Sequence, residues 1–252
     1  MEDKKPLVSI ILPVFNSEKF LHFCLKSLIR QSYKNIEIIA IDDNSKDNSF
    51  KILKSFRKQD KRLHVSKNIK KYGFPVCLNR ALKKAKGQFI TFMSANDTSL
   101  SQRIEKQLKY FKNNQKAVVV GVQCVFTDQN NKKLNKSIFP EKHEFIHKSL
   151  LSGLSMHFET AIINKFLLPK DILTFKENVY PFFYIDLFMR LLPYGEFANL
   201  SEFLHRHRKD TEFQGQSVNY IFSIAKLWLK SLTISDYRLP FSNLFAPLTK
   251  QA

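Results

Sequence analysis

Glycine is scarce in this sequence, with 6 residues among 252, whereas proteins on average contain about 7% glycine. Neither G-x-G-x-x-G nor G-x-x-x-x-G-K-S/T occurs. The glycine-rich loops that hold phosphate in dinucleotide-binding and P-loop proteins are therefore excluded. A phosphate group that binds to this protein must be held in another way.

Cysteine and long apolar runs are also lacking. Cys24, Cys77 and Cys124 are odd in number and lie inside apolar runs, which predicts buried reduced thiols rather than a disulfide framework or a zinc site. No apolar run reaches the about 18 residues that span a bilayer, and the first residues do not resemble a signal peptide. We expect a cytoplasmic protein, with peripheral contact at the inner face of the membrane left open.

Acidic residues are few beside basic ones, 22 against 41, which gives a net charge of +19. Such a field attracts polyanions, so nucleic acid, an acidic membrane and sugar-phosphate substrates are candidate partners. No nucleic-acid-binding module accompanies the charge, and we expect no nucleic acid partner. The basic stretch from Lys51 to Lys71 is interpreted as a solvated face, with a phosphate-binding or membrane-facing surface as the alternative.

Apolar runs and amphipathic segments alternate over the first 115 residues. This alternation predicts a parallel sheet with helices on both faces, and such sheets bind ligands beyond the carboxyl ends of their strands. Pro13 is expected to close the first strand and Gly87 to stop the third helix. We expect strands at 7–12, 36–41, 63–65 and 89–93, and helices at 17–31, 49–57, 76–86 and 101–111.

The pattern changes in the second half of the chain. A long apolar strand is expected at 118–126, and residues 132–215 are less periodic. An amphipathic helix at 218–232 is expected either to lie on a membrane or to pack on the core. We divide the chain into a first half at 1–115, a second half at 116–215, and a helix and tail at 216–252.

Polar residues follow two of the expected strands. Asp42 and Asp43 come directly after the second strand, and the segment from Ser94 to Asp97 follows the fourth. Carboxylates at these positions suit hydrogen bonds to a nucleoside or a hard cation at a diphosphate. Taken singly, each segment is more typical of a polar turn that caps the next helix, and the presence of two acidic strand ends side by side is what favours a ligand site.

Two histidine-containing segments stand out. His143 to His147 matches H-E-x-x-H, the zincin signature, with Glu159 and Glu177 as third-ligand candidates, but Pro140 lies just upstream and the N-terminal pattern does not suit a zincin. We therefore favour a chance spacing. His205-Arg206-His207-Arg208 is interpreted either as a clamp for a diphosphate leaving group or as an exposed basic loop.

Several motifs stand in a fixed order along the chain. They are VSIILPVFNSE at 8–18, LKSLIRQS at 25–32, IDDNSKDNS at 41–49, the ungapped stretch 73–87 with Asn79-Arg80 inside it, SQRIEKQ at 101–107 and DLFMRLL at 186–192. In this order and spacing the sequence resembles the family-2 nucleotide-sugar glycosyltransferases of the GT-A fold, closely over residues 7 to about 112 and loosely over 150–210. The expected fold class is α/β, with a mostly parallel central sheet, helices on both faces and a mixed C-terminal acceptor half.

The resemblance implies that residues 1–115 form a nucleotide-sugar-binding half and residues 116–215 an acceptor-binding and catalytic half. Phe15 would stack on a uracil-like base, Asp43 would accept a hydrogen bond from the base, and Asp42 would support Asp43. Phe15 stands where the family usually has tyrosine, and loss of the phenol leaves the stacking face intact. The expected nucleotide-binding residues are Pro13, Phe15, Glu18, Asp42, Asp43, Asn79 and Asn96.

The sequence departs from the family at two catalytic positions. The acidic motif D-A-D-D is here Ser94-Ala95-Asn96-Asp97, so the implied Mn or Mg ion would have Asp97 and Asn96 as its expected ligands. The family's general base aligns with Tyr184, and a tyrosine with a pKa of about 10 is a poor base at neutral pH. Asp186 and Glu177 match other acids of the family pattern. The expected catalytic set is thus Asp186, Glu177 and Tyr184.

The resemblance implies an inverting glycosyltransferase that moves a sugar from a nucleotide diphosphate donor, in particular a UDP-sugar, to a glycan or lipid-linked acceptor. Synthesis of surface polysaccharide or lipopolysaccharide is the implied role. Because the metal and base positions are altered, a catalytically impaired family member that acts as a binding or partner subunit is the alternative.

Overall fold

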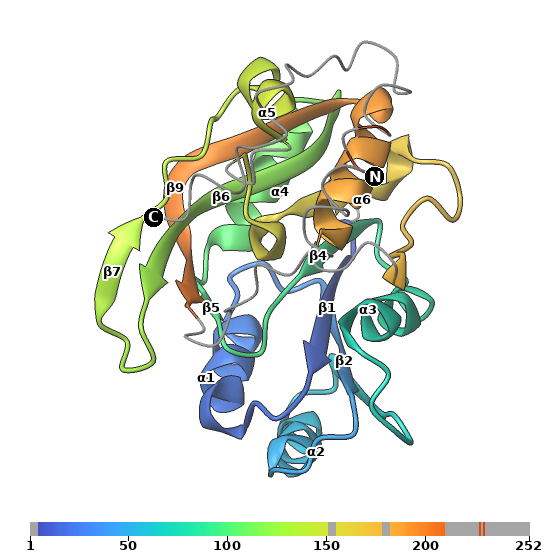
Figure 1. The fold of residues 1–252 in the computed structure, drawn as a ribbon, viewed down its shortest axis with the longest axis vertical. Helices are drawn as coiled ribbons and strands as arrows, with labels where there is room; N and C mark the ends of the chain where they lie inside the picture. The colour runs from blue at the N-terminus through green and yellow to red at the C-terminus, as the bar shows by residue number, and fades with distance from the viewer. Residues whose placement is uncertain (1–4, 151–154, 178–181, 210–226, 228, 230–252) are drawn as a thin grey trace.

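A mixed β-sheet runs through the protein (Figure 1). The computed structural model describes residues 5–150, 155–177, 182–209, 227 and 229. The first half of the sheet has the strand order β3 (Leu63–Lys67), β2 (Ile36–Asp42), β1 (Val8–Val14) and β4 (Phe89–Phe92). All neighbours in this half are parallel, as the alternation of strands and helices predicted.

The second half of the sheet is mixed, which also agrees with expectation. β8 (Ile162–Asn164) joins β4 to β6 (Ala117–Thr127) and is antiparallel to both. β9 (Glu196–Arg208) lies parallel to β6, and Figure 1 shows the two long strands side by side. The outer strands β5 (Thr98–Ser99) and β7 (Lys133–Lys136) pair with β9 and β6.

Helices cover both faces of the sheet. One face packs against α1 (Glu18–Ile29), α2 (Ser49–Gln59) and α4 (Arg103–Asn113). The other packs against α3 (Phe74–Leu82), α5 (His143–Ser149) and α6 (Phe183–Leu191). Successive residues of a strand point to opposite faces, so Ile10 and Ile11 of β1 belong to the two different cores. In Figure 1, α1 and α3 flank β1 on opposite sides.

Three short 3₁₀ helices complete the described elements: η2 (Phe158–Thr160), η3 (Lys165–Leu167) and η5 (Leu192–Tyr194). No helix among the described residues has the length and apolar character that a membrane crossing requires. The amphipathic helix expected at 218–232 lies outside the described residues, apart from Leu227, which is buried, and Leu229, which is exposed. The division at residues 115 and 215 stays a prediction.

The first strand does not end at Pro13, contrary to expectation. β1 continues to Val14, and Pro13 pairs in register with Ile41 of β2. The pairing of β1 with β4 ends at Ile11 and Phe92. Pro13 therefore lies where one flank of β1 has no partner strand, and a proline without an N–H is tolerated there.

Gly87 has a different role from the one expected. α3 ends at Leu82, so Gly87 does not stop the helix. Instead its N–H donates to Ser9 Oγ at 2.8 Å. A Cβ at this position would lie 2.6 Å from Ser9 N and 2.8 Å from Leu7 O. Gly87 is required because the chain passes so close to the start of β1.

We expect Gly87→Ala to lower the free energy of unfolding by about 1–3 kcal/mol, because the added methyl group meets backbone atoms that cannot move independently. Urea denaturation measures this change. Lys86→Ala is the matched control; Lys86 is exposed, and its removal should change stability by less than about 0.5 kcal/mol. Equal stability of the two variants would contradict this account of Gly87.

Candidate active site

A cleft of about 650 Å³ opens beyond the carboxyl ends of β1, β2 and β4. It lies where parallel sheets of this kind bind ligands. The segment that follows each strand supplies part of the wall, and the loop before α3 and Glu177 close the other sides. The described residues lining it are Pro13, Val14, Phe15, Ser17, Asp43, Lys71, Tyr72, Gly73, Phe74, Pro75, Cys77, Ser94, Ala95, Asn96 and Glu177.

Asp43 is the best-anchored acid of the cleft. Its Oδ1 accepts hydrogen bonds from Asn68 Nδ2 at 2.7 Å and Tyr72 N at 2.9 Å, and its Oδ2 accepts from Gly73 N at 2.8 Å. Burial alone would raise the pKa of Asp43, but these donors outweigh burial and lower the pKa below its usual value. Asp43 is therefore a fixed negative charge that orders the loop 68–73.

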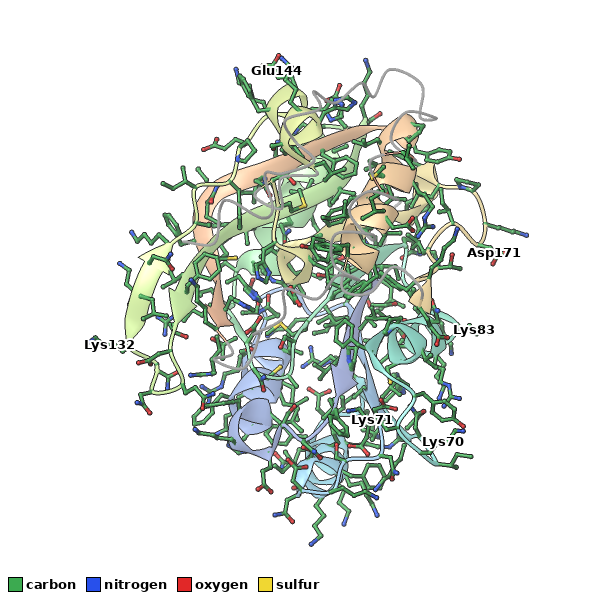
Figure 2. The ribbon with its side chains drawn as sticks, viewed as in Figure 1. Lys70, Lys71, Lys83, Lys132, Glu144 and Asp171 are labelled. Atoms are coloured by element: carbon green, nitrogen blue, oxygen red, sulfur yellow. The ribbon has the colours of Figure 1, made fainter. Side chains whose placement is uncertain are left out.

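Phe15 lies at the mouth of the cleft and is 38% exposed. Lys71 Nζ lies 4.1 Å from the centroid of the Phe15 ring, a cation–π contact. Figure 2 labels Lys71 beside the carboxyl end of β1, with Lys70 farther out on the same loop. Lys71 was grouped with the solvated basic stretch in the sequence, but it lines the cleft. Its position after β3, the neighbour of β2, was the signal that could have placed it there.

Asp42 and Glu18 stand behind the cleft rather than in its wall. Asp42 is buried, and its Oδ2 accepts from Ser45 N at 3.1 Å. Glu18 Oε2 accepts from both Asn48 N and Asn48 Nδ2 at 2.8 Å, which joins the start of α1 to the loop after β2. Both residues thus hold the frame on which Phe15 and Asp43 are placed.

Three other predicted residues are not among the described residues that line the cleft. Asn79 Nδ2 donates to Phe175 O and its Oδ1 accepts from Phe175 N, both at 2.8 Å. Asp186 is buried, and its Oδ2 accepts from Arg190 Nε at 3.0 Å. Tyr184 packs near Phe158. Of the expected catalytic set, only Glu177 lines the cleft, and it is exposed there.

The two expected metal ligands face different surroundings. Asn96 lines the cleft, but Asp97 is only 1% exposed. Asp97 Oδ2 contacts His205 Nε2 and His207 Nδ1, each at 3.0 Å, and its Oδ1 accepts from Arg208 N at 2.9 Å. Both oxygens are engaged by the protein. These two residues therefore do not fit a hard cation that needs open carboxylate oxygens in the cleft.

The surroundings of Asp97 form a buried polar cluster. Burial would raise the pKa of Asp97, but His207 and His205 outweigh burial and hold it well below its usual range. Burial lowers the pKa of His205 to about 4, against the opposing effect of Asp97. Arg103 is fully buried, with Nη1 donating to Glu159 O at 2.8 Å. Arg103 is not among the described residues that line the cleft.

The His205–Arg208 segment is part of β9, so its interpretation as an exposed loop is wrong. His205 and Arg208 are buried. Arg208 Nη1 donates to Asp128 O at 2.7 Å and Nη2 to Asn131 Oδ1 at 2.6 Å, while Nε donates to Asn96 O at 3.2 Å. The guanidinium therefore holds the loops around it, and none of these four residues is among those lining the cleft.

The H-E-x-x-H residues lie on α5, and the rings of His143 and His147 are 5.7 Å apart. His143 Nδ1 accepts from Phe197 N at 3.0 Å. No described histidine, cysteine or carboxylate completes a group of three with this pair. In Figure 2, Glu144 projects at the end of the molecule opposite Lys71. The structure favours the chance-spacing interpretation.

The fold is shared with solved glycosyltransferase structures. *S.* *aureus* TarS residues 1–349 in complex with UDP-GlcNAc superposes with a TM-score of 0.73 at 20% identity, over 96% of this chain and 71% of that one. The mannosyltransferase PcManGT of Pyrobaculum calidifontis, in complex with GDP-Man and Mn²⁺, gives 0.69 at 14% identity, over 96% and 68%. These neighbours define the class as a GT-A fold.

The family follows from the sequence matches. The model of glycosyl transferase family 2 matches residues 9–171, and the chain belongs to this family. An uncharacterized glycosyltransferase of Haemophilus influenzae is 32% identical, over 64% of this chain and 63% of its own length.

Two further relatives carry more specific names. The putative teichuronic acid biosynthesis glycosyltransferase TuaG of Bacillus subtilis is 34% identical over 44% of each chain. The UDP-Glc:alpha-D-GlcNAc-diphosphoundecaprenol beta-1,3-glucosyltransferase WfgD of Escherichia coli is 30% identical over 64% of this chain and 62% of its own length. The chain thus spans less than two thirds of each of these three relatives.

We expect Asp43→Asn to lower stability by about 1–3 kcal/mol at neutral pH, because an amide cannot accept all three hydrogen bonds. The folded pKa of Asp43 is depressed, so its contribution is present above the unfolded value of about 3.9 and is lost as pH falls through the folded pKa. The difference between variant and wild type should shrink as the pH falls below about 3.9. Urea denaturation across this range tests it, with exposed Asp171→Asn as control. A pH-independent difference would contradict the assignment.

Proposed function

We propose that this protein is an inverting glycosyltransferase that moves a sugar from a nucleotide diphosphate donor to a glycan or lipid-linked acceptor. The observation that carries the proposal is the cleft, in which an aromatic face, a fixed carboxylate and a second, exposed carboxylate come together at Phe15, Asp43 and Glu177. Membership of the family supports the reaction type. The named relatives support a role in the synthesis of surface polysaccharide.

The donor is proposed to be a UDP-sugar. A pyrimidine base would stack on Phe15, and its N–H would donate to Asp43 Oδ2, which accepts one protein hydrogen bond where Oδ1 accepts two. A base stacked on Phe15 would displace the Lys71 ammonium from the ring. The displaced ammonium would then lie near the diphosphate and offset its charge. The UDP-GlcNAc ligand of TarS and the UDP-Glc in the name of WfgD support this donor class.

The proposed reaction does not depend on a divalent ion. A structural neighbour contains Mn²⁺, and an ion of this kind would neutralise a leaving diphosphate. In this chain, however, Asn96 offers only an amide oxygen to the cleft, and Asp97 is committed to His205, His207 and Arg208. We propose that Lys71 and the amide of Asn96 contact the diphosphate directly.

Glu177 is the proposed general base. Inverting transfer requires a group that takes the proton of the acceptor hydroxyl as that oxygen attacks the sugar. Glu177 lines the cleft opposite the strand ends, whereas Asp186 is engaged with Arg190. The proton would pass from the acceptor hydroxyl to the Glu177 carboxylate as the bond to the diphosphate breaks.

The acceptor is proposed to be a glycan or a polyprenyl-linked sugar, because the name of WfgD includes such a lipid diphosphate. With a net charge of +19, the protein would be attracted to an acidic membrane, where lipid-linked acceptors lie. We therefore propose a cytoplasmic location with peripheral membrane contact.

The alternative is a partner subunit that binds a nucleotide-sugar without turnover. The engagement of Asp97 within the protein is the observation that favours it. Binding of a UDP-sugar without transfer or hydrolysis, in the presence of membrane acceptors, would select this alternative.

We expect Phe15→Ala to weaken UDP binding by about 1–3 kcal/mol, the scale of one base stacked on an aromatic ring. Isothermal titration calorimetry with UDP and UDP-sugars measures this loss. Phe145→Ala is the matched control, since Phe145 is 52% exposed on α5, outside the cleft. Unchanged affinity in Phe15→Ala would remove the base site from the proposal.

We expect Glu177→Gln to reduce kcat by about 10²–10⁴-fold, the usual contribution of a general base, while UDP affinity stays within about twofold. A radiolabelled UDP-sugar transfer assay with membrane acceptors measures the rate. Glu144→Gln serves as the control, because Glu144 is exposed on α5. Wild-type turnover in Glu177→Gln would exclude Glu177 as the base.

A further inference from the structure

Three histidines meet beside the cleft, in a cluster that the proposed reaction does not use. His205 and His207 lie on β9, and His157 immediately precedes η2. One ring nitrogen from each of the three lies within 4.8 Å of the others. The rings of His157 and His207 are 4.3 Å apart between centroids, and those of His157 and His205 are 5.9 Å apart.

The histidines are oriented by carboxylates, as metal-binding histidines are. Asp97 Oδ2 lies 3.0 Å from His205 Nε2 and 3.0 Å from His207 Nδ1. Glu159 Oε2 lies 2.9 Å from His157 Nδ1, at an ion-pair distance. Because a carboxylate only accepts, His205 Nε2 donates to Asp97, and the ring is fixed with its other nitrogen pointing away.

That other nitrogen has no partner. His205 Nδ1 is buried without a hydrogen bond among the described residues, and the His205 side chain is 0% exposed. A buried imidazole nitrogen without a partner is costly. His157 Nδ1 faces the Glu159 carboxylate at 2.9 Å, so a metal ion would bind the other nitrogen of this ring, Nε2. His205 Nδ1 is thus a buried nitrogen whose missing partner a metal ion would supply.

We propose that His157, His205 and His207 form a binding site for a divalent transition metal ion, in particular Zn²⁺. Imidazole nitrogens select zinc, copper, nickel and iron, whereas Mg²⁺ and Mn²⁺ prefer oxygen ligands. The site is thus distinct in chemistry from an ion bound to a donor diphosphate. Cys24, Cys77 and Cys124 take no part, since they are buried free thiols outside the histidine group.

The geometry and charge of the cluster fit such an ion. With zinc–nitrogen bonds of about 2.0–2.1 Å, tetrahedral ligand nitrogens lie about 3.3 Å apart. The rings therefore need to close by at most about 1.5 Å from their present separation. The two carboxylates of Asp97 and Glu159 would offset the charge of a dication. The side chains of His157 and His207 are 17% and 25% exposed, which gives the ion an entrance.

An ion bound by all three histidines would link β9 to the start of η2. Asp97, which orients two of the ligands, directly follows Asn96 of the cleft wall. The metal would therefore stabilise the wall of the cleft from behind without contacting a ligand bound in it. Its expected role is structural.

The test is zinc binding to the full chain after dialysis against a chelator. We expect one zinc per chain by elemental analysis, visible absorption bands typical of four-coordinate Co²⁺ when cobalt is added, and a rise in Tm of about 5–10 °C at saturating zinc. Mn²⁺ at the same concentration should leave Tm unchanged. Absence of stoichiometric zinc in the wild-type protein would overturn the proposal without any variant.

Variants locate the site. We expect His157→Ala and His207→Ala each to weaken zinc binding at least about 10–100-fold, with folding checked by circular dichroism. His143→Ala is the matched control, because it removes a histidine from the H-E-x-x-H pair on α5 and should leave zinc affinity unchanged. Loss of zinc in His143→Ala but not in His157→Ala would overturn the proposal and place the ion on α5.

Discussion

A buried carboxylate, Asp97, connects the two halves of this protein. It follows β4, the last parallel strand of the first half, and the described hydrogen bonds of its side chain all go to β9 of the second half. Removing a charge from water is unfavourable unless donors surround it. The position of the cleft wall at 94–96 therefore depends on two imidazoles and one backbone N–H that lie more than a hundred residues away in the sequence.

Asp43 also follows a parallel strand, but unlike Asp97 it lines the cleft. Its donors come from the adjacent loop 68–73, and the residue remains part of the cleft wall. Both aspartates follow parallel strands of one sheet. Asp43 orders a loop in the cleft wall, whereas Asp97 is buried beneath the wall. The difference lies in which donors the neighbouring elements supply.

The parallel half of the sheet was predictable because its strands and helices have a clear hydrophobic period, and the cleft lies beyond the carboxyl ends of the strands, where a ligand site was expected. β9 was not predictable, because its pairing with β6 contains register shifts and its buried positions include His205 and Arg208. The burial of Asp97 could not be predicted for the same reason, because the partners of its carboxylate lie on β9. The commitment of Asn79 to Phe175 depends on a contact 96 residues away, which no local pattern encodes.

The bond between Asn79 and Phe175 has a mechanical consequence. The side-chain amide of Asn79 pairs with both backbone groups of Phe175, in the manner of a one-residue strand. α3, which carries Asn79, begins directly after Gly73, whose N–H is held by Asp43. The segment 73–79 therefore links Asp43, which holds Gly73, to Phe175, which lies two residues before Glu177. The separation of the two acids of the cleft thus depends on this first part of α3, and a substitution there would change it without altering either acid.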